Sequence, residues 1–527
     1  MLLIAAALAG AAGWLVVRSG ALPPSLRTWE HAMIRTFKRW HHGPAAALAI
    51  ATGAPGSTAP LTVPPTQIGI SLSPPGNGQI YANLAKGGRW VLAPDGGRWE
   101  KLPIENLDAN GELKVVPPNA TVKRVLAEPV LGKDGVGVTC TYQGRGDVSI
   151  SGPPVGDPTR REGNFHFRWT TLHPAATVTI NITKIDAAQP IRNLDCRVDG
   201  TSKDALFAPE LLSIIRGFRI LRFMDWQNTN ANLAVTWTTR HTSQSFDSSG
   251  RDGIPIEDMV KLAILNGSDA WFNMPWNADD DYIRHFAQYV HDTLPNDRTV
   301  YVECSNEVWN WAFPVSRQAA QEGLDQHLGI DQKSALMHRY AQRLVQVMDI
   351  WASVFKDNPK RLVRVGASQH AVTDKTTLVL DYKDTSKHID AFATAPYFNI
   401  DSNIDAKSDD QIFDSLSSRL IQSINQSEKQ KTLSESHGLR YIAYESGQGV
   451  VLKDINLQKK IQRDNRMYEL YKNYIERWRA QIGDSIILYG TVFSIRESGA
   501  WGLIEHDGQP PSEAPKLRAV REWLDIH

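Results

Sequence analysis

The sequence predicts an α/β protein in which a (β/α)8 TIM barrel is preceded by an all-β sandwich domain. Residues 67–188 contain short runs with an apolar side chain at every second position, separated by turns rich in Pro and Gly. Between residues 189 and 527, strand-like runs alternate eight times with helical ones, as a β/α barrel requires. Two of the later strands end in a glutamate, and the active site of such a barrel lies at the carboxyl ends of its strands.

The first 66 residues predict an export segment and a linker. Residues 1–50 are interpreted as a signal or anchor. The stretch 1–17 is apolar and borderline in length for a membrane span, and a second interpretation places the basic region of a signal peptide at 35–39. Both predict an exported protein, either periplasmic, secreted or associated with the membrane through this segment. Residues 51–66 are rich in Pro, Gly and Thr, which is typical of a linker.

The individual elements follow from the same periodicities. The predicted sandwich contains strands at Val136–Tyr142, Val148–Ile150, Phe165–Trp169 and Thr177–Thr183. The predicted barrel strands are, in order, Arg192–Val198, Arg219–Trp226, Ala270–Trp276, Thr299–Ser305, Leu362–Gly366, Ala391–Tyr397, Arg440–Tyr444 and Ile486–Ser494. Helices are predicted between them, among them a long one at Ile455–Ile482. The join at 187–191 is too short for a flexible spacer, so we expect the sandwich to pack rigidly on the barrel.

Composition excludes several classes of function. Lys and Arg together number 57, as do Asp and Glu, so no charge excess indicates a nucleic acid partner. The 16 tryptophans fit carbohydrate binding, because sugars stack on indole rings. Three cysteines do not make a disulfide framework. The sequence lacks the motifs of zinc proteases, phosphate-binding loops and dinucleotide folds, so neither a metal nor another cofactor is predicted.

The two glutamates that follow strands carry the chemical argument. The run Thr299–Trp311 contains Asn306-Glu307 at the end of a strand, and Leu439–Gly447 delivers Glu445 in the same way. Cleavage of a glycosidic bond is the commonest chemistry that needs two positioned carboxyl groups beside aromatic platforms. Each glutamate also has a plainer explanation, since Glu307 would suit a capping position and Glu445 a surface salt bridge.

These two strand ends resemble the clan of retaining (β/α)8 glycoside hydrolases, which places an Asn-Glu acid/base after strand 4 and a nucleophilic glutamate after strand 7. The run 302–310 also resembles bacterial glycosyl hydrolase-like proteins labelled cellulose-binding. The resemblance implies that Glu307 is the acid/base and Glu445 the nucleophile. It further implies that Asn306 binds the sugar 2-hydroxyl and that Arg222 orients the nucleophile.

Aromatic residues at other strand ends complete the predicted site. By resemblance, Tyr397 lies near the nucleophile and Trp501 forms the floor beneath the sugar. The remaining candidate substrate contacts are Trp226, Trp276 and Trp309. Two acidic features are interpreted as structural. Glu303 points into the barrel and needs an arginine partner, and the cluster 279–281 caps a helix.

The sequence therefore predicts a retaining glycoside hydrolase acting on a carbohydrate, with a β-linked glucan-type polysaccharide or oligosaccharide as the expected substrate. One alternative is a carbohydrate-binding protein on the same fold with little turnover. A transglycosylase is another, because it differs only in whether water or a sugar intercepts the intermediate. A metal-dependent hydrolase would need His and Asp at the strand ends, which instead carry Trp, Asn and Glu. The sugar, the linkage and the oligomeric state do not follow from the sequence.

Overall fold

A computed structural model describes residues 65–526 except 131–134, 154, 162, 171–176, 247–252 and 402–407. The predicted signal or anchor segment at 1–50 lies outside the described residues, as does nearly all of the predicted linker at 51–66. Within the described part of the chain, no helix combines the length and the apolar character that crossing a membrane requires.

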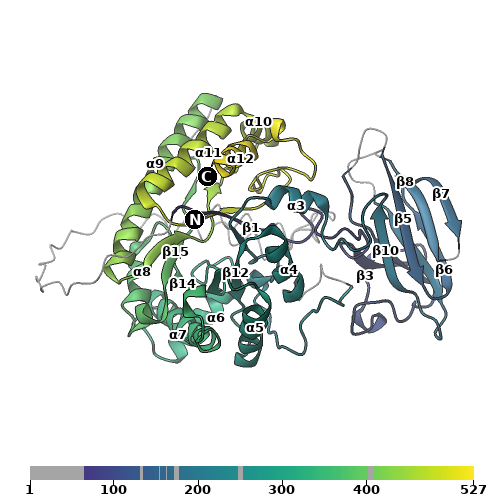
Figure 1. Ribbon diagram of the computed structural model, residues 1–527, viewed down its shortest axis with the longest axis horizontal. Coiled ribbons are helices and arrows are strands. Elements are labelled where there is room, and N and C mark those ends of the chain that lie inside the picture. Colours follow the sequence, from purple (N-terminus) through teal and green to yellow (C-terminus); the bar gives the residue numbers. More distant parts are fainter. Residues whose placement is uncertain are drawn as a thin grey trace, which may run out of the picture. The chain divides into compact units, whose positions relative to one another are not determined.

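Eight parallel strands close into a barrel, which confirms the predicted β/α architecture (Figure 1). In order around the barrel they are β1 (Ile68–Ser71), β11 (Ile220–Arg222), β12 (Asp269–Met274), β13 (Val300–Cys304), β14 (Leu362–Ala367), β15 (Ala391–Thr394), β17 (Arg440–Ala443) and β19 (Ile486–Tyr489). Most residues of these strands are buried, because side chains fill the barrel on one face and helices cover the other.

The first barrel strand is not the predicted one. The segment predicted as strand 1 is β10 (Arg192–Val198), which pairs antiparallel with β5 (Val136–Gln143) in the sandwich. Its buried Leu194 and Cys196 alternate with more exposed polar residues, as in a strand with only one covered face. The barrel is instead closed by β1, whose four residues are all buried. The predicted boundaries at 67 and 189 therefore differ from the structure, in which the sandwich is inserted between barrel strands β1 and β11.

Gly69 allows β1 to fit between its two neighbours. A β-carbon at this position would lie 2.4 Å from Ile487 Cδ1 and 2.8 Å from the carbonyl oxygen of Ile220. These residues belong to β19 and β11, the two strands that β1 joins. The absence of a side chain at Gly69 is thus required for the packing of the barrel interior at the point of closure.

The sandwich consists of two antiparallel sheets. One has the order β10, β5, β8 (Asn164–Trp169) and β7 (Val155–Arg161), and the other the order β3 (Glu100–Lys101), β2 (Arg89–Pro94), β4 (Ala120–Val125), β9 (Thr179–Ile185) and β6 (Gly146–Ser151). A disulfide between Cys140 and Cys196 joins β5 to β10, a pairing that the sequence analysis did not foresee. The third cysteine, Cys304, is buried and free.

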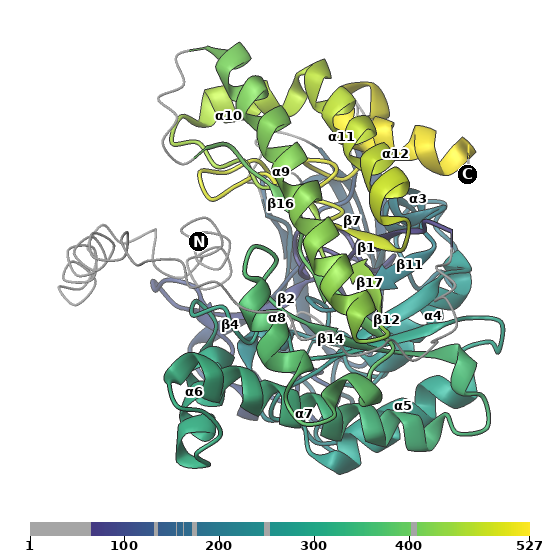
Figure 2. The same ribbon diagram turned by 90° about the vertical axis from the view of Figure 1, so that its left-hand side faces the viewer.

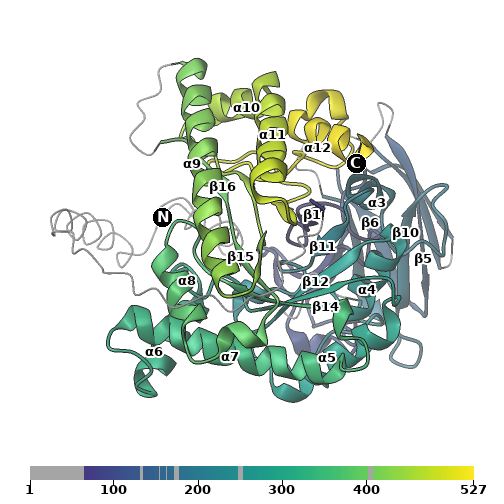
Figure 3. The ribbon, with the colours of Figure 1, turned by 60° about the vertical axis from the view of Figure 1, so that its left-hand side comes forward.

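Ten helices surround the barrel or flank its loops in the described residues (Figures 2 and 3). They are α3 (Pro209–Ile215), α4 (Ile256–Asn266), α5 (Asp280–Thr293), α6 (Pro314–Asp325), α7 (Gln332–Val354), α8 (Thr373–Leu380), α9 (Asp409–Ser436), α10 (Ile455–Arg463), α11 (Asn465–Arg477) and α12 (Pro515–Ile526). Asp279 caps α5 as predicted, because its side chain accepts a hydrogen bond from the backbone of Tyr282. The helix predicted at 455–482 is divided by Asp464, which caps α11.

The sandwich and the barrel share buried contacts. Arg124 of β4 is fully buried and donates a 3.2 Å hydrogen bond to the carbonyl oxygen of Phe246, which lies in the loop after β11. The Phe246 ring belongs to the same apolar cluster as the sandwich core. Tyr81, in the segment after β1, donates a 2.9 Å hydrogen bond to Asp258 of α4. A loop of the barrel thus completes the interior of the sandwich.

Candidate active site

The turn after β13 places Glu307 at the carboxyl end of the barrel. Ser305 and Glu307 have φ angles of 59° and 43°, a left-handed conformation that costs a residue with a β-carbon about 1–2 kcal/mol. A 2.8 Å hydrogen bond from the side chain of Asn273 to the carbonyl oxygen of Ser305 holds this turn. Such strained backbone is concentrated at functional sites, where the surrounding structure imposes it.

Both carboxyl oxygens of Glu307 accept hydrogen bonds. The hydroxyl of Tyr444 donates to Oε1 at 2.9 Å, and the side-chain amide of Asn310 donates to Oε2 at 2.7 Å. Tyr444 lies directly before Glu445 in the chain and is fully buried. The sequence analysis predicted Tyr444 as the last residue of a strand and did not foresee its bond to Glu307. The two candidate catalytic segments are therefore connected across the barrel.

Glu445 follows β17 and occupies a different environment. Its Oε1 accepts a 2.7 Å bond from Arg222 Nη1, and its Oε2 accepts a 3.1 Å bond from the Tyr397 hydroxyl. Burial raises the pKa of Glu445 above its ordinary value; Arg222 opposes the rise, and the negative charges of Glu307 and Asp225 add to it. The Arg222 guanidinium also lies 5.1 Å from the centre of the Tyr444 ring, so the residues bonded to Glu445 and to Glu307 are in contact.

Arg222 connects the buried acids at the base of the site. Its Nη2 and Nε donate to Glu303 Oε2 at 2.9 and 3.1 Å, and Nη2 also donates to Asn306 Oδ1 at 3.0 Å. Trp271 completes the environment of Glu303 by donating to the same oxygen at 3.0 Å. The arginine partner expected for Glu303 is thus Arg222. The amide group of Asn306, predicted to bind a sugar hydroxyl, is in addition bonded to Asn230 at 3.0 Å.

Four side chains, which we call the aromatic wall, lie beside Glu445: Tyr397, Tyr489, Trp501 and the neighbouring Asp225. The ring of Trp501 lies edge-on to Tyr397, with centroids 5.6 Å apart, and to Tyr489, with centroids 6.4 Å apart. The Tyr489 hydroxyl donates a 3.0 Å hydrogen bond to Asp225 Oδ2. All four side chains are partly exposed, so this wall is accessible to a ligand. Tyr397 and Trp501 were predicted here, whereas Tyr489 and the role of Asp225 were not.

Three predicted substrate contacts are buried in this structure. Trp226, Trp276 and Trp309 are 1%, 3% and 5% exposed. The indole N–H of Trp226 donates to the carbonyl oxygen of Ser73, and that of Trp276 donates to Glu322. Trp309 packs against Tyr444, the residue that bonds Glu307, with ring centroids 6.4 Å apart. Contact of these indoles with a sugar stays a prediction.

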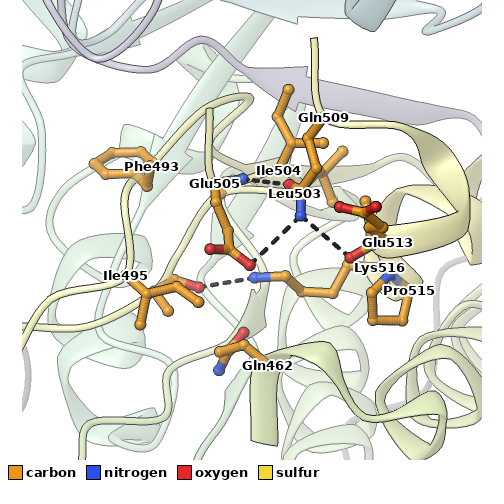
Figure 4. Close-up of a pocket in the computed structure, with 13 residues that line it drawn as sticks. Gln462, Phe493, Ile495, Leu503, Ile504, Glu505, Gln509, Glu513, Pro515 and Lys516 are labelled. Atoms are coloured by element: carbon orange, nitrogen blue, oxygen red, sulfur yellow. Dashed lines mark hydrogen bonds between the residues drawn. The ribbon is translucent and has the colours of Figure 1, made fainter. Parts of the chain in front are cut away.

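Lys516, labelled in Figure 4, supports the loop that carries Trp501. Lys516 of α12 is 5% exposed, and its ammonium group donates a 2.8 Å hydrogen bond to the carbonyl oxygen of Ala500. The side chain of Gln448 donates to the same oxygen at 2.6 Å. Burial lowers the pKa of Lys516 to about 7, and Glu505 opposes the change. The backbone beside Trp501 is thus fixed from two sides.

The described residues contain no group of three or more His, Cys, Asp or Glu side chains that could hold a metal ion. The site is defined by two buried glutamates after the fourth and seventh strands of a β/α barrel, an arginine shared between acids, and an aromatic wall.

Solved structures that resemble this chain are glycoside hydrolases. An α-L-arabinofuranosidase from Thermotoga maritima is 12% identical with a TM-score of 0.41, over 60% of this chain and 64% of that one. A β-glucosidase from the same organism is 10% identical with a TM-score of 0.35, over 60% and 84%. A xyloglucan-specific endo-β-1,4-glucanase from a metagenomic library is 11% identical with a TM-score of 0.32, over 60% and 88%. The chain thus spans less than two thirds of the arabinofuranosidase. No family model and no curated protein matches the sequence.

Proposed function

We propose that this protein is a retaining glycoside hydrolase that uses Glu445 as nucleophile and Glu307 as acid/base. The supporting observation is the contrast between the two carboxyl groups. Glu445 is bonded to a buried arginine, which favours its ionised form against the burial that raises its pKa. Among the described residues, the donors to the Glu307 carboxyl are the neutral groups of Tyr444 and Asn310. A double displacement needs one group held as an anion and a second that alternates between acid and base.

The reaction then proceeds in two steps. An oxygen of Glu445 attacks the anomeric carbon, and the bond to the leaving oxygen breaks as Glu307 transfers its proton to that oxygen. A water molecule next attacks the glycosyl–enzyme ester, giving a proton to Glu307 and releasing the Glu445 carboxylate. This path predicts a separation of about 5–5.5 Å between the two carboxyl groups, whereas inversion needs roughly 6.5–9.5 Å.

The proposed substrate is a β-linked glucan-type polysaccharide or oligosaccharide. Trp501 is partly exposed and contacts Tyr397, which bonds the nucleophile, and Trp311, four residues beyond Glu307, is 42% exposed. An accessible indole near each glutamate in the chain or in space suits a ligand longer than one sugar. We further propose that the protein is exported. The Cys140–Cys196 disulfide supports this, because such bonds persist mainly in oxidising compartments.

Chemical rescue tests the assignment of roles. Glu445→Ala should abolish release of reducing sugar from a polysaccharide panel, and azide should restore turnover of an activated aryl glycoside while giving a glycosyl azide. Glu307→Gln serves as the matched variant, because it removes the proton donor and leaves the nucleophile in place. Wild-type activity in Glu445→Ala would contradict the proposal. Sugar binding by the unmodified protein without any turnover would instead indicate a binding protein.

A further inference from the structure

The aromatic wall consists of four partly exposed side chains: Asp225, Tyr397, Tyr489 and Trp501. Asp225 follows β11, Tyr397 follows β15 and Tyr489 ends β19, so these residues lie at the carboxyl end of the barrel, where the active site of such a fold lies. The proposed catalytic pair is almost fully buried. Tyr397 bonds Glu445, so the wall adjoins the nucleophile, and Asp225 is the only acidic member of the wall.

Asp225 is only half satisfied by the protein. Its Oδ2 accepts the 3.0 Å hydrogen bond from Tyr489, but in the part of the chain that the structure describes no donor bonds the other oxygen, Oδ1. Tyr489 is itself in ring contact with Tyr397, which bonds the nucleophile Glu445. One acceptor oxygen is thus left on the aromatic wall, three contacts away from the nucleophile, through Tyr489 and Tyr397.

Among the described residues around Glu445, acidic side chains outnumber basic ones. The charges of Asp225 and Glu307 both act on Glu445, and the basic side chain whose charge acts on Asp225 is Arg222. All three guanidinium nitrogens of Arg222 already donate to protein acceptors. No nitrogen of this arginine is therefore left without an acceptor, and a substrate carboxylate would have to displace one of those partners.

We propose that Asp225 makes the site selective for uncharged sugars, with Oδ1 accepting a hydrogen bond from a sugar hydroxyl and the carboxylate rejecting uronic acids. The inference rests on the proposed glycosidase function and specifies its substrate class. A uronate would place its own carboxylate near Asp225, Glu307 and Glu445, whose negative charges exceed the positive charge of Arg222. Such like-charge contacts are strongly disfavoured. A hydroxyl group instead repeats the contact that Tyr489 makes with the other oxygen.

Paired substrates that differ only at C6 test the selectivity. Turnover is measured at pH 8, where the Asp225 carboxyl is ionised, for 4-nitrophenyl β-glucoside against the β-glucuronide, and for the galactoside against the galacturonide. The unmodified protein is compared with Asp225→Asn. The asparagine keeps an acceptor oxygen and the size of the side chain while removing its charge. We expect the unmodified protein to favour the neutral member of a pair by on the order of 100-fold, and Asp225→Asn to reduce that ratio by about tenfold or more. Glu497→Gln, which changes an exposed carboxylate in the loop before Trp501, should leave the ratio unchanged.

Binding is measured separately, by tryptophan fluorescence titration with methyl β-glucoside, methyl β-galactoside and their uronate counterparts. Selective binding of a neutral sugar without turnover would refute the hydrolase and support the charge selection. Equal use or binding of the uronate, a ratio unchanged in Asp225→Asn, or no binding and no turnover of the neutral sugars would overturn the inference.

Discussion

Arg222 lies 2.7 Å from the Glu445 carboxylate and 2.9 Å from that of Glu303, so a single buried cation is shared by two acids. One of these acids is the proposed nucleophile and the other belongs to the barrel interior. The geometry depends on the planar guanidinium, which donates in several directions at once. A lysine would supply the same charge from a single point.

Replacing Arg222 tests whether the shared guanidinium helps to keep Glu445 ionised. Arg222→Lys should lower kcat/KM by at least about 100-fold, because the ammonium group cannot bond both acids in this geometry. The acid limb of the pH–rate profile should move upward, since Glu445 would lose part of the interaction that opposes its raised pKa. Arg219→Lys, at an exposed position before the same strand, is the matched control. An unchanged acid limb would show that Arg222 does not hold the nucleophile ionised.

Tyr444 should affect Glu307, the proposed acid/base. Tyr444→Phe removes the hydroxyl that donates to Glu307 at 2.9 Å and leaves the ring packing in place. Hydrogen bonds to a charged group contribute about 1.5–3 kcal/mol, so the loss should lower kcat/KM by about 10–100-fold. Tyr468→Phe, which alters a tyrosine bonded to Glu522 away from the site, should leave kcat/KM as it is. If both variants kept the kcat/KM of the unmodified protein, Tyr444 would be a packing residue only.

The position of the Trp501 ring should depend on Lys516. Trp501→Ala should reduce kcat/KM by about 3–10-fold without loss of fold, because an aromatic stacking contact contributes about 0.5–1.5 kcal/mol. Lys516→Met removes one of two donors to the Ala500 carbonyl and should raise KM more than it lowers kcat. In the Trp501→Ala background, Lys516→Met should have little further effect, since the two changes act through one element. Additive effects would show that Lys516 does not act through Trp501.

Stability should depend on the proton held by Asp225. Burial raises the pKa of Asp225 to about 7, while Tyr489 and Arg222 oppose the rise. The folded chain then binds this proton more tightly than the unfolded chain does. The stabilisation is complete below the unfolded value near 3.9 and is lost as pH rises through about 7. Asp225→Asn should therefore have a higher Tm than the unmodified protein near pH 8 and a similar one near pH 4. Glu497→Gln is the control, and an equal Tm difference at both pH values would contradict the prediction.

The parts of the site that the sequence predicted are those set by strand order. Glu307 and Glu445 follow the fourth and seventh strands, as expected, and Arg222 and Tyr397 lie beside the nucleophile. Their positions follow from the rule that strand ends meet at one face of a barrel. The bond from Tyr444 to Glu307 crosses the barrel, and no local pattern encodes such a contact.

The parts of the structure that the sequence did not predict have physical causes as well. Trp226 and Trp276 also follow strands, but residue type and position do not show how deeply an indole is buried or that it bonds a neighbouring loop. The first barrel strand was missed because β1 has only four residues and because the sandwich separates it from β11. With β1 overlooked, the next strand-like run, β10, took its place in the count of eight.

The insertion of the sandwich leads to the final prediction. A chain that begins at residue 189 lacks β1, so β11 and β19 lose the strand that joins them and the barrel is left open with two unpaired edges. We expect this chain to be insoluble or to melt without a cooperative transition. A chain that begins at residue 65 keeps all eight strands and should melt cooperatively with full activity.

A third chain separates the loss of β1 from the loss of the sandwich. Tyr81 and Phe207 form an antiparallel bridge, so the chain enters and leaves the sandwich at neighbouring points, and a short Gly/Ser linker can join residue 82 to residue 206. This deletion retains β1 and should fold cooperatively, but with a lower Tm, because Phe246 loses the apolar cluster in which it is buried. Circular dichroism melts of the three chains distinguish the effect of losing β1 from that of losing the sandwich. If the chain from residue 189 folded as well as the deletion did, β1 would not be needed for barrel closure.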